Sequence, residues 1–303
     1  MLPKNEKRTI DKSSKIKLWV YGVPYSGKTT LADQFPDVLF LNTDGNINSF
    51  TSPVVEIKEQ LVGRESVKAW EVFKNTIDEL QQGSEFKTIV VDLLEDTYEA
   101  CRLYCYDKLC IEHESDNSFK AWDFVRNEFL NTMKKLTTLK YHIVLISHED
   151  TSKDVTKKNG DAVTAIKPNI QEKIANKVSG MVDATVRLLA NGNDRKLDFK
   201  TDDVVFGGGR LKLKETEIPV TFEALLEVYN YQDNLTTEDN VYSPTASATK
   251  HRIRDNRRGQ QTTETSEQTQ TEQSPRPRRE RTARVRDNRA ESEAVTENDN
   301  VPF

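Results

Sequence analysis

The sequence predicts an α/β domain built on a mainly parallel sheet between helices, followed by a disordered C-terminal tail. Three observations lead to this fold class. Short, unbroken apolar runs alternate with segments of helical periodicity, a pattern typical of parallel strands that are buried on both faces. A glycine-bearing turn comes directly after the first apolar run, at Gly22. The composition then changes near Asn234, beyond which aromatic residues become rare.

Four apolar runs predict the buried strands of the sheet. They are residues 16–21 (IKLWVY), 38–42 (VLFLN), 88–92 (TIVVD) and 142–147 (HIVLIS). Around them we expect helices at residues 28–35, 66–82, 95–111, 119–139, 170–180 and 219–230. Two late strands at 182–190 and 195–200 are joined by Asn191-Gly192-Asn193-Asp194, which favours a hairpin turn.

The composition divides the chain into three parts. Of the 303 residues, 35% are hydrophobic and 31% are charged, which is too polar for one packed domain of this length. We expect a flexible N-terminus at 1–14, a globular domain at 15–232 and a disordered tail at 233–303. The tail is rich in Thr, Glu, Gln, Asn, Arg and Pro, so it cannot bury enough apolar surface to offset the entropy of ordering.

Charge and hydropathy exclude some classes of protein. The formal net charge is −5 and the pI is about 5.6, so there is no overall basic field, and any contact with nucleic acid has to be local. No apolar run approaches the roughly 18 residues needed to span a bilayer. The polar N-terminus lacks the pattern of a secretory signal. We therefore expect no membrane contact and a cytoplasmic location.

The turn after the first strand matches a phosphate-binding loop. Residues 22–29 (GVPYSGKT) fit the pattern G-x-x-x-x-G-K-[ST] at every fixed position, between a predicted strand and a predicted helix; the alternative is a chance match in a turn. Glycine permits close approach of phosphate oxygens, and N–H groups at a helix start hold the anion. We expect ATP as the ligand, with Lys28 at the β- and γ-phosphates and the Thr29 hydroxyl on Mg²⁺. The candidate binding residues are Gly22, Val23, Pro24, Tyr25, Ser26, Gly27, Lys28, Thr29 and Thr30.

Three further positions at strand ends are candidates for the chemistry. Asp92 ends the strand at 88–92, where a Walker B carboxylate would hold Mg²⁺; the alternative is an ordinary helix cap. Asp44 follows the strand at 38–42, where a carboxylate could orient the attacking water, or could simply belong to the turn Asp44-Gly45-Asn46. Ser147 and His148 end the fourth strand and could sense the γ-phosphate, although a lone histidine is more often structural.

The segments GVPYSGKT, FLNTDGN, TIVVD and LISHE, in this order, resemble the RecA-core ATPases of bacteriophage recombination modules. These are compact single-strand annealing relatives of RecA, within the broader class of AAA-type ATPases. The run IEHESD at 111–116, with Trp122 and Glu128-Phe129 downstream, also resembles this family. The resemblance covers about residues 15–230. It implies a RecA-like P-loop NTPase core, ATP hydrolysis, action on single-stranded DNA, and homo-oligomers with ATP sites at subunit contacts.

The resemblance also implies roles for matched residues. Asp44 stands where the family usually has a water-activating Glu, and Asp is one methylene shorter. Ser147 and His148 match the strand tip that couples the nucleotide state to a DNA-binding loop, which would be residues 151–169. Candidate DNA contacts in that loop are Lys153, Lys157, Lys158 and Lys167, although a charged run is more often only a solvated loop. A cation from a neighbouring subunit could complete each ATP site, and the candidates are Arg187, Arg195, Lys200 and Arg210.

Three cysteine residues and one histidine lie close together within residues 101–113. Cys101, Cys105, Cys110 and His113 raise the question of a metal site. Zinc sites usually show tighter C-x₂₋₄-C pairs in loops, so buried free thiols are the favoured interpretation.

The predicted tail has two parts of opposite charge. Residues 250–289 carry twelve Lys and Arg residues spaced for loose contact with a nucleic-acid backbone. Residues 291–303 are acidic and end in Val301-Pro302-Phe303. This end resembles the acidic tip of bacterial single-stranded-DNA-binding proteins, which implies docking on host replication or repair proteins. The alternative is coincidence on a polar tail.

The sequence thus favours an ATP-hydrolysing, RecA-like protein that acts on single-stranded DNA in phage recombination or replication, in the cytoplasm of an infected host. Two alternatives remain. One is an ATP-gated adaptor without enzymatic activity that recruits host proteins through its tail. The other is a nucleotide or small-molecule kinase, which would need an acceptor pocket and an arginine-rich lid.

Overall fold

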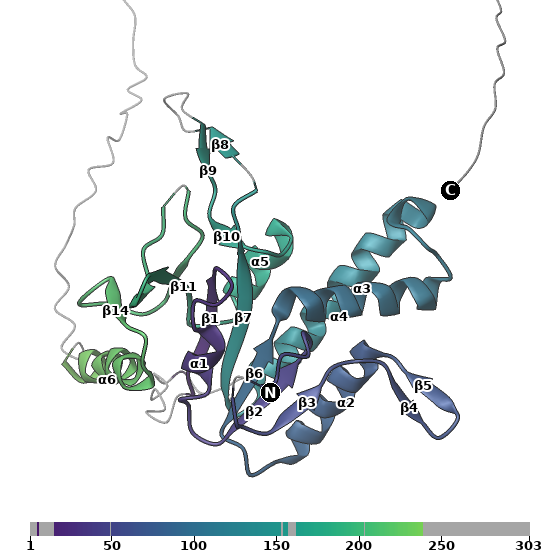
Figure 1. Ribbon diagram of the computed structural model, residues 1–303, viewed down its shortest axis with the longest axis horizontal. Helices are drawn as coiled ribbons and strands as arrows, with labels where there is room; N and C mark the ends of the chain where they lie inside the picture. Colours follow the sequence, from purple (N-terminus) through teal and green to yellow (C-terminus); the bar gives the residue numbers. More distant parts are fainter. Residues whose placement is uncertain are drawn as a thin grey trace, which may run out of the picture. The chain divides into compact units, whose positions relative to one another are not determined.

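A computed structural model of the chain describes Asn5 and residues 15–48, 50–152, 154–156, 162–202 and 204–238. These residues belong to one compact unit. It is a mixed α/β structure with a mostly parallel central sheet, which confirms the predicted fold class (Figure 1). The expected N-terminal segment 1–14, apart from Asn5, and the tail beyond Glu238 lie outside the described residues.

Five parallel strands form the centre of the sheet, in the order β11-β1-β7-β6-β2. They are β1 (Lys17–Gly22), β2 (Val38–Asn42), β6 (Thr88–Asp92), β7 (His142–Asp150) and β11 (Ala184–Asn191). Nearly every residue of β1, β2 and β6 is buried, which is why these strands read as continuous apolar runs rather than alternating ones.

The register aligns the carboxyl ends of these strands. Gly22 of β1 pairs with His148 of β7, and Asp92 of β6 pairs with both Ile146 of β7 and Asn42 of β2. Because neighbouring parallel strands run in the same direction, the polar residues that follow their apolar runs meet at one edge of the sheet.

Shorter strands extend the sheet at both sides. At one side, β3 (Val54–Glu56) runs parallel to β2; at the other, β12 (Asp194–Asp198) and β14 (Glu217–Pro219) continue the sheet in antiparallel fashion. The β11–β12 hairpin confirms the turn predicted at 191–194. The sequence did not predict β3 or β14. Six further short strands were also missed, which are β4 (Gln60–Val62), β5 (Glu65–Val67), β8 (Asp154–Thr156), β9 (Ala162–Thr164), β10 (Lys167–Pro168) and β13 (Gly208–Gly209).

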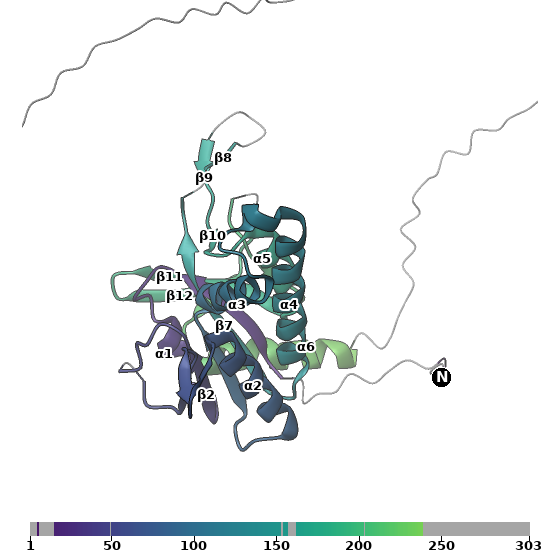
Figure 2. The same cartoon turned by 90° about the vertical axis from the view of Figure 1, so that its right-hand side faces the viewer.

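Helices cover both faces of the sheet, as Figures 1 and 2 show. The helices α2 (Ala69–Gln82), α3 (Leu94–Leu109), α4 (Ser118–Thr138) and α5 (Glu172–Ser179) share one apolar cluster with the sheet. The helices α1 (Lys28–Ala32) and α6 (Phe222–Glu238) share the cluster on the other face. Successive strand residues alternate between the two clusters; in β6, Ile89 and Val91 belong to the first and Val90 to the second.

Three predicted helix boundaries differ from the structure. The helix expected from 66 begins at Ala69, because residues 65–67 form β5 and pair with β4 across Gly63, whose φ is 67°. The helix expected at 28–35 ends at Ala32. The helix expected at 219–230 is α6, which begins at Phe222 and continues to Glu238, past the expected domain boundary at 232. A short 3-10 helix (Glu114–Asn117) precedes α4. No helix among the described residues is long and apolar enough to cross a membrane.

The core under α4 yields a stability prediction. Phe129 is fully buried and its ring lies 5.0 Å from that of Tyr98 and 5.9 Å from that of Trp70. We expect Phe129→Ala to lower the free energy of unfolding by about 3–5 kcal/mol, because it leaves a cavity. The matched control is Phe124→Ala on the same helix, where the side chain is 40% exposed and the loss should stay below about 1 kcal/mol. Chemical denaturation of both variants measures the difference, and equal losses would contradict the packing described here.

Candidate nucleotide-binding site

The phosphate loop, residues 22–29, connects β1 to α1 at the carboxyl edge of the sheet. Gly27 caps the helix with φ of 102°, a conformation that favours glycine, and Tyr25 has φ of 63° and is almost fully exposed. The hydroxyl of Ser26 is buried and has no hydrogen-bond partner among the described residues. The loop therefore has the backbone form and the spare polar capacity of an anion cradle.

Lys28 folds back over this loop. Its Nζ donates to the carbonyl oxygens of Gly22, at 3.0 Å, and Val23, at 2.9 Å. Burial lowers the pKa of the amine, and the nearby Asp92 carboxylate partly opposes that shift. Among the described residues, the hydrogen bonds of this ammonium go to carbonyl oxygens and not to a carboxylate, so an anion in the loop would add a favourable charge interaction.

Thr29 and Asp92 join the loop to β6. The Thr29 hydroxyl donates to Asp92 Oδ2 at 2.9 Å, although β7 lies between β1 and β6 in the sheet. Asp92 is 3% exposed. Burial, with a further contribution from the charge of Asp44, raises the pKa of Asp92 to about 6. A hydroxyl and a carboxylate at hydrogen-bond distance are two oxygen ligands of the kind Mg²⁺ prefers.

Asp44 lies in the turn after β2. Its Oδ1 accepts hydrogen bonds from Asn42 Nδ2 at 2.9 Å and from the Asn46 backbone at 2.8 Å, while Asn42 Oδ1 accepts from the Gly45 backbone. Asp44 is thus a turn residue, as one interpretation expected, and it also lines the same pocket as Lys28 and Asp92. The two interpretations left open by the sequence are compatible.

His148 also lines this pocket and is linked to α3. Glu95 Oε1 accepts a hydrogen bond from the His148 backbone at 2.7 Å and lies 3.0 Å from Nδ1 of its ring. Ser147, one residue earlier, is fully buried and accepts from the Trp19 indole at 3.0 Å. Within the expected pair, His148 therefore lies at the site and Ser147 belongs to the core. The sequence analysis did not assign Glu95 to His148, because nothing in the sequence pairs residues 53 positions apart.

These residues surround a pocket of about 440 Å³. Its lining includes most of the residues predicted for the nucleotide site, namely Pro24, Tyr25, Gly27, Lys28, Thr29, Thr30, Asp44, Asp92 and His148, together with the candidate cation Arg195. Asn46 and Leu93, which were not predicted, also line it. Arg195 comes from β12 of the same chain. The other three candidate cations are held elsewhere: Arg187 pairs with Glu149, Lys200 pairs with Glu217, and Arg210 donates to the Gly180 carbonyl.

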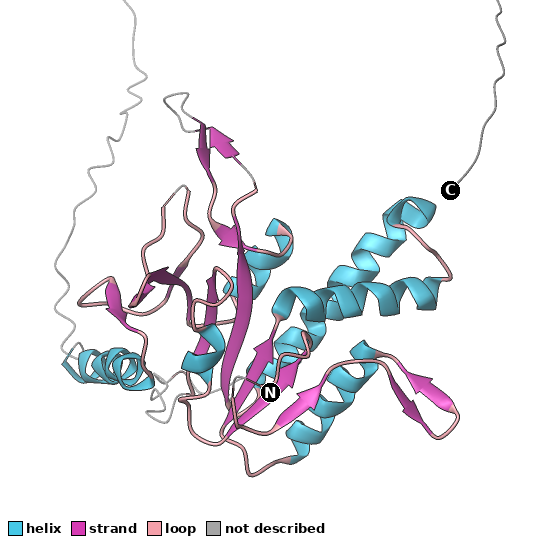
Figure 3. Cartoon of the chain, in the orientation of Figure 1, coloured by secondary structure: helices cyan, strands magenta, loops and turns pink. Residues whose placement is uncertain are grey.

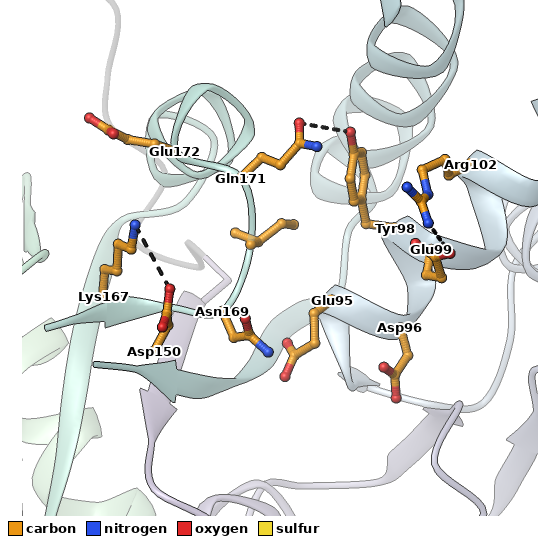
Figure 4. Close-up of a pocket in the computed structure, with 11 residues that line it drawn as sticks. Glu95, Asp96, Tyr98, Glu99, Arg102, Asp150, Lys167, Asn169, Gln171 and Glu172 are labelled. Carbon is orange, nitrogen blue, oxygen red and sulfur yellow. Dashed lines mark hydrogen bonds and ion pairs between the residues drawn. The ribbon is translucent and has the colours of Figure 1, made fainter. Parts of the chain in front are cut away.

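Glu95 also lines a second pocket, of about 470 Å³ (Figure 4). Carboxylates of α3 and β7 line it, and Lys167 of β10 pairs with Asp150 there at 3.8 Å. Burial and the charge of Glu95 raise the pKa of Asp96 in this pocket. Glu95 lines this second pocket and is linked to the nucleotide pocket through His148: its Oε1 binds His148, while Oε2 is buried without a partner among the described residues.

The segment expected to form a DNA-binding loop is a short antiparallel arm, β8 paired with β9, which Figure 3 shows extending from the end of β7. Lys153, Lys157 and Lys158 lie outside the described residues. The side chain of Lys167 is 13% exposed and is paired with Asp150, so it would have to give up that partner to meet a DNA phosphate.

The cysteines lie away from this site. Cys101 and Cys105 are buried in the core and Cys110 is exposed; all three are free thiols. His113 lies near the 3-10 helix and its ring nitrogen Nδ1 is 3.0 Å from the Ser115 hydroxyl. Within the described ranges, no group of three or more His, Cys, Asp or Glu side chains is arranged to hold a metal ion.

ATP with Mg²⁺ fits the residues present. The unpartnered Ser26 hydroxyl and the Lys28 ammonium are donors for phosphate oxygens, and the Thr29–Asp92 pair supplies oxygen ligands for the ion. Gly22 packs so closely that an added Cβ would lie 2.6 Å from the Leu188 carbonyl oxygen, so the start of the loop accepts only glycine.

The raised pKa of Asp92 gives a prediction for the protein without Mg²⁺ and nucleotide. Because the folded pKa of about 6 lies above the ordinary carboxyl pKa of 3.8, Asp92 contributes to stability below pH 4, and this contribution is lost as the pH rises through 6. We expect Asp92→Asn to raise the free energy of unfolding at pH 8 by on the order of 2–3 kcal/mol. The difference from wild type should vanish near pH 4. Urea denaturation at the two pH values checks this, and a variant less stable than wild type at pH 8 would contradict it.

Comparison with known proteins places the chain in a family. No curated protein matches it. Among solved structures, the flagellar accessory protein FlaH from Methanocaldococcus jannaschii is similar at 12% identity over 60% of this chain and 77% of that one, with a TM-score of 0.30, a likeness too weak to carry an argument. A family model described as an AAA domain matches residues 14–211, which is more than half of the chain and includes all the residues that line the nucleotide pocket. The chain therefore belongs to this AAA domain family of P-loop NTPases.

Proposed function

We propose that the protein is a Mg²⁺-dependent ATPase that acts on single-stranded DNA, in annealing or recombinase fashion, during phage recombination or replication. The observation that supports the ATPase part is the hydrogen bond between Thr29, at the end of a phosphate loop that matches its pattern at every fixed position, and Asp92. It brings the two expected metal ligands together, one from α1 and one from the end of β6, in a pocket that is also lined by Lys28, Asp44 and His148.

Each residue of the pocket has a separate role in the proposed reaction. The phosphate loop and Lys28 bind and orient the phosphates, and Thr29 with Asp92 would hold Mg²⁺. The ion, when bound, neutralises charge on the phosphate oxygens. Asp44, fixed by Asn42 and by the Asn46 backbone, orients and polarises the attacking water. His148 lies close enough to respond to the terminal phosphate, and its bond to Glu95 passes that response to α3.

The DNA part of the proposal rests on the β8–β9 arm and on the resemblance to phage recombination ATPases. The arm begins at Asp154, six residues after His148, so a change at the nucleotide pocket can reach it through the end of β7. We propose that Lys153, Lys157 and Lys158 of the intervening segment contact the DNA backbone. We also propose homo-oligomers, and docking of the Val301-Pro302-Phe303 end on host replication or repair proteins; that end lies outside the described residues.

Turnover measured with and without single-stranded DNA tests the proposed function. We expect wild-type protein to hydrolyse ATP with Mg²⁺ and to be stimulated by single-stranded DNA. Lys28→Ala should abolish hydrolysis and weaken ATP binding, because it removes the buried ammonium from the loop. Lys87→Ala, an exposed lysine that pairs with Asp37 and does not line the pocket, is the matched control and should hydrolyse ATP normally. Unchanged turnover in Lys28→Ala would rule out this site, binding without turnover would favour an adaptor, and phosphoryl transfer to a small acceptor would favour a kinase.

Asp44 can be tested separately from binding. We expect Asp44→Asn to keep ATP affinity and to slow hydrolysis by ~10²-fold or more, the scale of a lost general base. Asparagine preserves the size of the side chain and can still accept from the Asn46 backbone, so the turn should persist. Single-turnover kinetics with pre-bound ATP isolate the chemical step. Normal turnover would show that Asp44 is only a turn residue; Glu95 and Asp96 would then be the carboxylates to test.

A further inference from the structure

The β11–β12 hairpin brings an arginine to the phosphate loop of its own chain. Strand β11 pairs with β1 from Ala184 to Arg187, and then continues to Asn191 beyond the point where β1 ends. The returning strand β12 places Arg195 opposite Ala190 in this overhanging part of the hairpin. In Figure 2 the hairpin and α1, the helix that follows the loop, both lie toward the left of the view.

Two glycines let the hairpin and the loop approach each other. An added Cβ at Gly22 would lie 2.6 Å from the Leu188 carbonyl oxygen of β11. At Gly27 it would lie 2.7 Å from Nη1 of Arg195, so the guanidinium rests directly against the loop. The phosphate-loop pattern requires glycine at both positions, and here the same two glycines also accommodate the hairpin.

The charges around Arg195 leave it available for a ligand. Arg195 lines the nucleotide pocket together with Lys28. Within the part of the chain that the structure describes, no carboxylate forms an ion pair with Arg195, whereas the next residue, Lys196, lies 3.5 Å from Asp194 and 3.7 Å from Glu217. An exposed guanidinium at the rim of an anion cradle provides a planar set of donors that matches phosphate oxygens.

We propose that Arg195 binds phosphate oxygens of the nucleotide in cis, as a second cation beside Lys28. This inference rests on the proposed nucleotide-binding function and names a further residue of the same site. It differs from the expectation that Arg195 reaches a neighbouring subunit, because its guanidinium already lies in the pocket of its own chain. Each chain therefore carries both phosphate-binding cations of its site.

Nucleotide binding by three variants tests the proposal. We expect Arg195→Ala to weaken ATP binding by about 10- to 100-fold, the range for a lost charge-assisted hydrogen bond. Arg195→Lys should recover part of the affinity, since it keeps the charge and loses the planar fork. Lys196→Ala is the matched control on the same strand and should bind as wild type does. All three should melt near the wild-type temperature without ligand, while ATP should raise the melting temperature of Arg195→Ala less than that of wild type.

Mixing of the Lys28→Ala and Arg195→Ala variants, at an ATP concentration too low to saturate Arg195→Ala, separates action in cis from action in trans. If Arg195 acts in cis, Lys28→Ala and Arg195→Ala proteins should not restore each other's ATPase activity, because no chain in the mixture has both cations. Recovery of activity on mixing would overturn the cis assignment, and wild-type ATP affinity in Arg195→Ala would overturn any phosphate contact. Absence of ATP binding in wild-type protein would overturn the proposed function and this inference together. Weaker binding in the Arg195 variants, with normal binding in Lys196→Ala, would support both.

Discussion

The hydrogen bond between Thr29 and Asp92 is the contact on which the geometry of the site depends. It joins α1, the helix that follows β1, to the end of β6, and it depends on β7 lying between β1 and β6 in parallel register. The same register places His148 beside Gly22 and Asn42 beside Asp92. A slip of one residue in β7 would move its side chains to the opposite face of the sheet and disturb both core clusters, so the packing of the core fixes the geometry of the pocket.

Burial at this edge of the sheet has an electrostatic cost. It lowers the pKa of Lys28 and raises the pKa of Asp92, so both groups are held where their charged forms are disfavoured. A structure selected only for stability would replace such groups with apolar ones. Their retention is consistent with a site whose charges are compensated by a ligand, because a polyanion and a divalent cation bring the missing counter-charges together. The unpartnered Ser26 hydroxyl fits the same explanation.

The two pockets at this edge are connected through one carboxylate. Glu95 comes from the first turn of α3, binds His148 with one oxygen and borders the second pocket. Asp150 and Lys167 also line that pocket; Asp150 ends β7, just before the β8–β9 arm, and Lys167 pairs with it from β10. A displacement of His148 thus has a short physical path, through Glu95 and the end of β7, to the base of the arm. This arrangement gives the ATP site and the proposed DNA contact a shared element rather than two independent loops.

Local sequence determined much of this protein: the buried strands, the phosphate loop, Asp92 at the end of its strand and the hairpin turn at 191–194 are visible because apolar periodicity and glycine placement act over a few residues. The short strands β4, β5, β8 and β9 were missed, since three-residue polar strands have no periodicity to detect. Only the tertiary structure decided that Ser147 is core while His148 is at the site, that Glu95 meets His148, and that Arg195 alone among the four candidate cations lies in the pocket. These outcomes depend on which strands are neighbours and on how far a hairpin overhangs the sheet. Such distances between residues remote in sequence arise only when the core packs, and no local pattern encodes them.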